Sequence, residues 1–87
     1  MSNIVFLPLG WFDYQSWIAE NNRRILKKIL ELITDISRNG NTGIGKPLAL
    51  IGDLSGWWSR RITEEHRLIY MVEGDNIYIA KCRGHYN

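Results

Sequence analysis

The chain has 87 residues, a net charge of +2 and an aromatic content of 11%. This length allows one domain, residues 1–87, and excludes a second hydrophobic core. The small net charge excludes a cationic field over the whole surface, so any binding of nucleic acid must depend on a local basic patch.

The N-terminal half is predicted to contain one strand and two helices. Residues 3–7 are an apolar run suited to a strand, which Pro8 and Gly10 should end. Apolar residues then recur at helical spacing from Trp11 to Ile18 and mark a first helix. A clearer stripe marks a second helix, which should end at Asn39-Gly40-Asn41; its members are Ile25, Ile29, Leu32, Ile33 and Ile36.

The C-terminal half is predicted to contain a long loop and three strands. Residues 40–56 hold five of the eight glycines, which favours a loop. Residues 57–62, 66–72 and 77–83 read as strands, and the short connections between them predict an antiparallel meander. The expected fold is therefore α+β in the order β-α-α-β-β-β, with both helices packed on one face of an antiparallel sheet and the other face partly open.

Basic residues should gather on the open face of this sheet. Strand alternation places Arg67, Ile69 and Met71 on one side of the middle strand and Leu68 on the other. The residues expected on the open face are Arg61, Arg67, Lys81, Arg83 and His85. Such a face suits a phosphodiester, but an ordinary solvated surface, or arginines stacked on tryptophans at the core edge, would give the same pattern.

Several classes of site are not predicted. The single cysteine, Cys82, cannot form an internal disulfide and is expected to be a buried small hydrophobe. Two widely spaced histidines and one cysteine do not make a metal site, and no cofactor is predicted. No apolar run approaches the ~18 residues of a membrane helix, and no signal peptide precedes the domain, so a soluble cytoplasmic protein without a membrane partner is expected.

A dense set of short motifs resembles the YoeB/Txe branch of the RelE superfamily, bacterial toxins of type II toxin–antitoxin systems. The matching segments are Asp13-Tyr14, Trp17, residues 24–29, residues 43–47, Leu54-Ser55-Gly56, residues 58–62, residues 65–70 and His85-Tyr86. The resemblance implies a RelE-like, microbial-ribonuclease-like fold. It also implies an mRNA endoribonuclease of the 70S ribosomal A site, with a cognate antitoxin that covers the site.

The family reaction, attack of a ribose 2′-hydroxyl on the adjacent phosphate, assigns roles by resemblance. Arg67 matches the phosphate-stabilising arginine, Arg61 its supporting arginine and His85 the general acid. Tyr86 matches the residue that orients mRNA. Lys46 matches a basic loop residue, and further RNA-backbone contacts are predicted for Arg60, Lys81 and Arg83.

The chain departs from the family in the loop before the strands. The family usually reads Gly-Lys-Pro-Glu-Pro-Leu-Lys, whereas residues 45–51 read Gly-Lys-Pro-Leu-Ala-Leu-Ile. Leu48 thus stands at the general-base glutamate and Ile51 at a catalytic-site lysine. Because leucine cannot accept a proton, and general-base catalysis is typically worth about 10²–10⁴-fold, cleavage should be impaired.

An alternative reading is a protein-binding domain, engineered on a toxin scaffold or naturally divergent. Polar-to-apolar changes in residues 7–12 and 48–51 would form one exposed apolar surface if the two segments lie close. Its members would be Leu7, Leu9, Trp11, Phe12, Leu48, Leu50 and Ile51. A designed partner or a homodimer would then occupy that surface.

Overall fold

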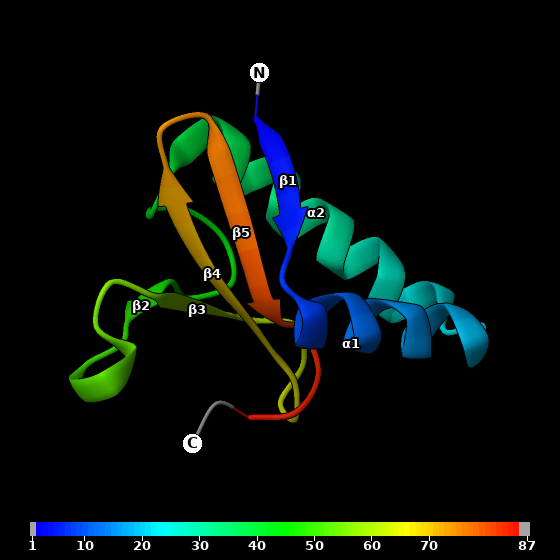
Figure 1. Ribbon diagram of the computed structural model, residues 1–87. Helices are drawn as coiled ribbons and strands as arrows, with labels where there is room; N and C mark the ends of the chain where they lie inside the picture. Colours follow the sequence, from blue (N-terminus) through cyan, green and yellow to red (C-terminus); the bar gives the residue numbers. More distant parts are fainter. Residues whose placement is uncertain (1, 86–87) are drawn as a thin grey trace.

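The computed structural model describes residues 2–85 and arranges them in two layers, a pair of helices against a five-stranded sheet (Figure 1). The elements in chain order are β1 (Asn3–Phe6), α1 (Pro8–Ala19), α2 (Arg23–Asn39), β2 (Leu48–Ala49), a 3-10 helix (Gly52–Leu54), β3 (Trp58–Arg61), β4 (Arg67–Glu73) and β5 (Asn76–Lys81). The α+β class and the two helices on one face are confirmed.

The sheet is mixed, so the prediction of a purely antiparallel sheet is wrong. Its strand order is β1-β5-β4-β3-β2. β3, β4 and β5 form the expected antiparallel meander, but β1 pairs in parallel with β5, with Asn3 opposite Asn76 and Phe6 opposite Ile79. Parallel pairing needs a crossover, and here α1 and α2 carry the chain from the β1 edge toward the opposite edge (Figure 1).

Helix α1 begins at Pro8, earlier than the breakers Pro8 and Gly10 suggested. Proline is favoured in the first helical turn, where its missing N–H costs nothing. Gly10 lies inside the helix because the backbone of β5 passes there: a Cβ at Gly10 would be 2.3 Å from the carbonyl oxygen of Ile79. Both residues therefore fix how α1 starts and how closely it packs on the sheet.

Helix α2 follows the predicted stripe. The side chain of Asn22 caps its start by accepting a hydrogen bond from the Ile25 amide at 3.2 Å. Ile25, Ile29, Leu32 and Ile36 are all buried and meet residues from the helix-facing side of the sheet. These sheet and α1 partners include Trp17, Leu68, Tyr70, Ile77, Ile79 and Cys82. This core leaves the other face of β3 and β4 free for a site.

The predicted loop of residues 40–56 contains short ordered pieces. Its two-residue strand β2 pairs with the edge of β3, with Leu48 opposite Ser59 and Ala49 opposite Trp58. β2 was not predicted from the sequence, because a strand of two residues is too short to show an alternating pattern. In the described residues no helix is long and apolar enough to span a membrane.

The apolar segments 7–12 and 48–51 do not form one surface, so that prediction is wrong. Residues 7–12 follow β1 at one edge of the sheet, while residues 48–51 include β2 at the other edge (Figure 1). Four inter-strand steps separate β1 from β2, about 19 Å. Leu50 is also buried, although Leu9, Phe12, Leu48 and Ile51 are exposed as expected. Of the other two members, Leu7 is half-buried and Trp11 is 47% exposed.

Candidate functional site

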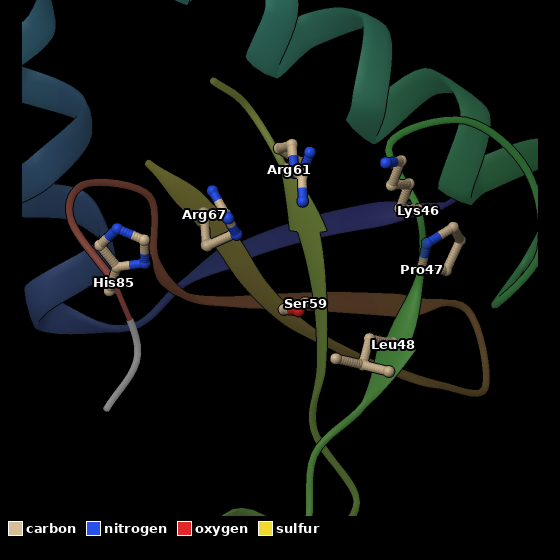
Figure 2. Close-up of a pocket in the computed structure, with 7 residues that line it drawn as sticks. All are labelled: Lys46, Pro47, Leu48, Ser59, Arg61, Arg67 and His85. Atoms are coloured by element: carbon tan, nitrogen blue, oxygen red, sulfur yellow. The ribbon is translucent and has the colours of Figure 1, made fainter. Parts of the chain in front are cut away.

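A cleft of about 720 Å³ opens on the sheet face away from the helices, over β2, β3 and the start of β4. It is lined by Lys46, Pro47, Leu48, Ser59, Arg61, Arg67 and His85. Figure 2 shows the nitrogen-bearing side chains as an arc around Ser59 and Leu48. The structure thus brings together the predicted residues Lys46, Arg61, Arg67 and His85.

Arg67 is held by the turn between β3 and β4. Its Nη1 donates to the carbonyls of Thr63 at 2.7 Å, Glu64 at 3.1 Å and His66 at 3.2 Å. Among the described residues, Nε and Nη2 make no hydrogen bond to protein. One edge of the guanidinium is therefore fixed, while the remaining donors can bind an anion with little ordering cost.

Arg61 lies on β3, and Lys46 lies beside it on the preceding loop (Figure 2). The Arg61 amide donates to the Gly45 carbonyl at 2.7 Å, which ties the loop to β3. Gly45 has no room for a side chain, because a Cβ would be 2.7 Å from Leu32 Cδ2. Lys46 adopts a φ of +52°, rare for a residue with a side chain, so the loop is constrained at the point where Lys46 reaches the cleft.

Arg60 is buried, so its prediction as an RNA contact is wrong. All five of its N–H donors are used inside the protein. Nε donates to Tyr70 Oη, Nη1 to Asp35 Oδ2 and the Ile44 carbonyl, and Nη2 to the carbonyls of Gly40 and Thr42. The side chain is 0% exposed, and the Asp35 pair measures 2.5 Å. Alternation explains the error, since Arg60 and its neighbour Arg61 face opposite sides of β3.

The Arg60 contacts also organise the loop that leads to the cleft. Residues 40–44 wrap around the guanidinium, and the Ile44 amide donates to Asp35 Oδ2 at 3.1 Å. The hydrogen bond from Arg60 holds the pKa of the Asp35 carboxyl below its usual value of 3.8, against the opposing effect of burial. Asp35 therefore stays ionised and keeps the loop closed near neutral pH.

His85 follows β5 on a short C-terminal segment, residues 82–85. Its ring lines the cleft beside Arg67 (Figure 2). The other predicted basic residues of this region do not reach the cleft. Arg83 lies over the Trp17 ring at 3.9 Å and pairs with Glu20 at 2.7 Å, and Lys81 Nζ donates to the His85 carbonyl. Tyr86 lies outside the described residues.

The two altered loop positions lie in different places. Leu48 lines the cleft and is 55% exposed, whereas Ile51 is 87% exposed and is not part of the lining. Consequently the described cleft contains no carboxylate. His85 is the one imidazole among the side chains that line the described cleft. The cleft offers cations and a proton donor but, in the described part of the chain, no strong base.

Cys82 is confirmed as a buried small residue. Burial, with a smaller contribution from the charge of Asp13, raises the pKa of its thiol to about 12. A thiol in this state is inert as a nucleophile. No group of three or more His, Cys, Asp or Glu residues within residues 2–85 is arranged to hold a metal ion.

Ser59 and Pro47 line the cleft although the sequence did not single them out. Ser59 shares the open side of β3 with Arg61, two residues away, so strand alternation was the available signal. Its hydroxyl lies on the cleft floor between Leu48 and the arginines (Figure 2).

The chain is similar to known proteins over nearly its whole length. The family model described as a YoeB-like toxin of bacterial type II toxin-antitoxin systems matches residues 6–86. Toxin YoeB of Escherichia coli K12 is 57% identical over 95% of this chain and 98% of its own length. Toxin YoeB of Streptomyces coelicolor is 49% identical over the same shares.

Solved structures are similar to this chain as well. A YoeB/ParE toxin from Agrobacterium tumefaciens has a TM-score of 0.91 and 41% identity, covering 99% of this chain and 100% of that one. A YoeB–YefM complex from Staphylococcus aureus has a TM-score of 0.90 and 47% identity, covering 99% of each chain. YafQ of E. coli, at 15% identity and a TM-score of 0.76, shares the fold. Nothing in these comparisons supports a domain engineered for another partner. This chain belongs to the YoeB-like toxins of bacterial type II toxin–antitoxin systems.

Proposed function

We propose that this chain is the toxin of a toxin–antitoxin pair and that it cleaves mRNA in the A site of the 70S ribosome, in the bacterial cytoplasm. The observation that carries the proposal is the convergence of Lys46, Arg61, Arg67 and His85 in one open cleft. The cleft is lined by three cations and has no lid in the described chain. It therefore suits an extended phosphodiester better than a small enclosed ligand.

The chemistry follows from where charge and protons move. The 2′-oxygen of a ribose attacks the adjacent phosphorus, and the bond to the 5′-oxygen of the next nucleotide breaks. Negative charge grows on the phosphoryl oxygens, and the free donors of Arg67, supported by Arg61, are placed to stabilise it. The imidazolium of His85 protonates the leaving 5′-oxygen. Tyr86, beside it in sequence, is proposed to orient the mRNA.

Because leucine cannot accept a proton, Leu48 should make removal of the proton from the 2′-hydroxyl the slow step of the reaction. With no carboxylate lining the described cleft, the 2′-hydroxyl must lose its proton to water or to a neutral His85. We therefore expect slow cleavage. The same observation favours a second candidate function, which is binding to the ribosome and its mRNA without cutting.

Two classes of protein partner follow from the relatives. Solved structures of the S. aureus toxin show a complex and a heterotetramer with the antitoxin YefM, and a YoeB dimer. We propose that this chain likewise binds a cognate antitoxin that covers the cleft, and that it can form a homodimer.

Primer extension decides between the candidates. The purified chain is added to a defined mRNA, either free or being translated in a reconstituted system. A break that appears only during translation supports the nuclease. Co-sedimentation with ribosomes without any break supports the binder. If neither a break nor co-sedimentation is found, both candidates are wrong.

A further inference from the structure

The C-terminal segment (residues 82–85) belongs to no helix or strand, yet its backbone is held tightly. Helix α1 holds its first half. The Cys82 amide donates to Asp13 Oδ2 at 3.0 Å, and the Cys82 carbonyl accepts from Trp17 Nε1 at 2.9 Å; both bonds are buried. Arg83 then stacks on Trp17 and donates to Ser16 and Glu20. No described hydrogen bond joins α1 to the segment beyond Arg83.

The second half is held by residues 66 and 67. The Gly84 amide donates to Nδ1 of His66 at 2.9 Å, and the Gly84 carbonyl accepts from the Arg67 amide at 3.0 Å. Gly84 has a φ of +76°, a conformation that glycine enters and leaves easily. Gly84, just before His85, therefore has the most freely varying backbone of the segment, and the His66 side chain restrains it.

His66 is itself fixed in place. Its ring meets the Trp17 ring edge-on, with centroids 4.8 Å apart and planes at 80°. Its amide donates to Thr63 Oγ1 at 3.2 Å, and its carbonyl accepts from the amide of Ile62 at 2.9 Å. His66 therefore connects α1, the β3–β4 turn and the C-terminal segment.

We propose that His66 is a positioning residue for His85, acting through the Gly84 amide. This inference rests on the function proposed above. Nδ1 accepts a hydrogen bond, so His66 must be neutral with its proton on Nε2. The bond holds Gly84 in its left-handed conformation and so directs the His85 ring into the cleft beside Arg67. Without it, the described segment beyond Arg83 keeps only the bond from the Arg67 amide to the Gly84 carbonyl and the contact of Lys81 with the His85 carbonyl, so the ring is held less precisely. A misplacement of about 1 Å can cost about 10²-fold in rate.

Two variants separate the acceptor from the ring. His66→Phe keeps an aromatic edge against Trp17 but has no acceptor. His66→Asn lacks the ring but places an amide oxygen close to the position of Nδ1. Cleavage is followed on mRNA-programmed ribosomes under single-turnover conditions, which separates the rate at saturating toxin from the toxin concentration that gives half that rate. Hydrogen exchange of the Gly84 amide is measured by NMR on the same proteins.

His66→Phe should lower the saturating rate by about 10–100-fold, leave the half-saturating concentration unchanged and speed exchange at Gly84. His66→Asn should recover most of both losses. Equal impairment in the two variants would assign the effect to ring packing and overturn the proposal. So would an unchanged saturating rate in His66→Phe.

The proposal can fail separately from the proposed function. If the unmodified chain cuts nothing, the nuclease function is wrong, and slow exchange at Gly84 in His66→Phe would still contradict the hydrogen-bond role. If His66→Phe does not fold, two other measurements replace it: the ¹⁵N spectrum of the His66 imidazole in the unmodified chain, and exchange of the Gly84 amide in His66→Leu, which also lacks the acceptor. A proton on Nδ1 overturns the proposal. An Nε2–H tautomer, together with faster Gly84 exchange in His66→Leu than in the unmodified chain, supports it.

Discussion

Adjacent residues of one type have opposite roles in β3. Arg60 is 0% exposed and donates all of its N–H groups to acceptors within the protein, while Arg61 lines the cleft. The single ion pair of Arg61, with Glu64 at 3.4 Å, is largely exposed and therefore adds little stability. At the residue scale, the side of the strand decides whether an arginine supports the fold or faces the open cleft.

Restoring a base at Leu48 should increase cleavage. Leu48→Glu is expected to raise the rate of ribosome-dependent cleavage at least about tenfold, because a general base contributes about 10²–10⁴-fold. Since Ile51 does not line the cleft, adding Ile51→Lys should contribute less than Leu48→Glu. Primer extension time courses measure both. Leu48→Gln, similar in size but unable to act as a base, is the control, and an equal gain from it would contradict the assignment.

Arg67→Ala should reduce cleavage with a small effect on stability. Loss of one preorganised donor to a transition state costs about 10²–10³-fold. Its fixed edge bonds only to exposed or half-buried carbonyls of a turn, so the free energy of unfolding should fall by less than about 2 kcal/mol. Single-turnover cleavage and urea unfolding test the two parts. Arg67→Lys keeps the charge and should recover only part of the rate.

The elements that shape the cleft depend on Arg60. Its contacts connect α2 through Asp35, the loop at residues 40–44 and β4 through Tyr70. The loop then continues to Lys46 and Leu48, so one buried side chain sets the rim of the cleft.

Arg60→Met should strongly destabilise the protein. Removal of one partner of a fully buried ion pair costs about 3–5 kcal/mol. Because Asp35 is 18% exposed, the loss from the pair should be smaller, but three loop carbonyls also lose a donor. Urea unfolding measures the loss. The matched control is Arg61→Met, one residue away, which should change stability by less than about 1 kcal/mol. Similar losses in both variants would contradict the structural role of Arg60.

Gly10→Ala should weaken the packing of α1 on β5. Alanine is normally the better helix former, but its Cβ would lie 2.3 Å from the Ile79 carbonyl oxygen. Forced overpacking costs about 1–3 kcal/mol. Thermal unfolding measures the change, with Gln15→Ala on the exposed side of α1 as the control. An unchanged or raised midpoint in Gly10→Ala would show that the helix can shift away from the sheet.

Helix α2 and the meander of β3, β4 and β5 were predictable from the sequence, because their periodicity and short turns are local signals. The parallel pairing of β1 was not, since nothing in residues 3–6 specifies a partner far along the chain. Gly10 was interpreted as a breaker, because the contact that requires glycine there is with β5, far along the chain. Of the predicted site residues, Arg61, Arg67, Lys46 and His85 line the cleft. The burial of Arg60 could have been predicted from strand alternation, which places it on the other side of the strand from Arg61, but its partner Asp35 in α2 could not.

Over the whole molecule, Cys82 reports on unfolding. Because burial raises the pKa of its thiol to about 12, very little of Cys82 is thiolate at pH 8 in the native state. A disulfide reagent should therefore label Cys82 very slowly in buffer and rapidly in urea, where the pKa returns to about 8.5. Absorbance of the released thiol follows the reaction. Fast labelling in buffer would mean that the C-terminal segment opens without global unfolding.

The pairing of β1 with β5 joins residues 3–6 to residues 76–79. During synthesis, the first strand leaves the ribosome long before its neighbour exists. β5 also brings Ile77 and Ile79 to the core and leads into the segment with His85. A nascent chain without residues 76–85 therefore has neither a closed sheet nor a complete cleft, and both can form only once β5 and His85 have been made. If the finished protein attacks translation, a chain cut short before β5 should be harmless to ribosomes, and expression of residues 1–75 alone tests this.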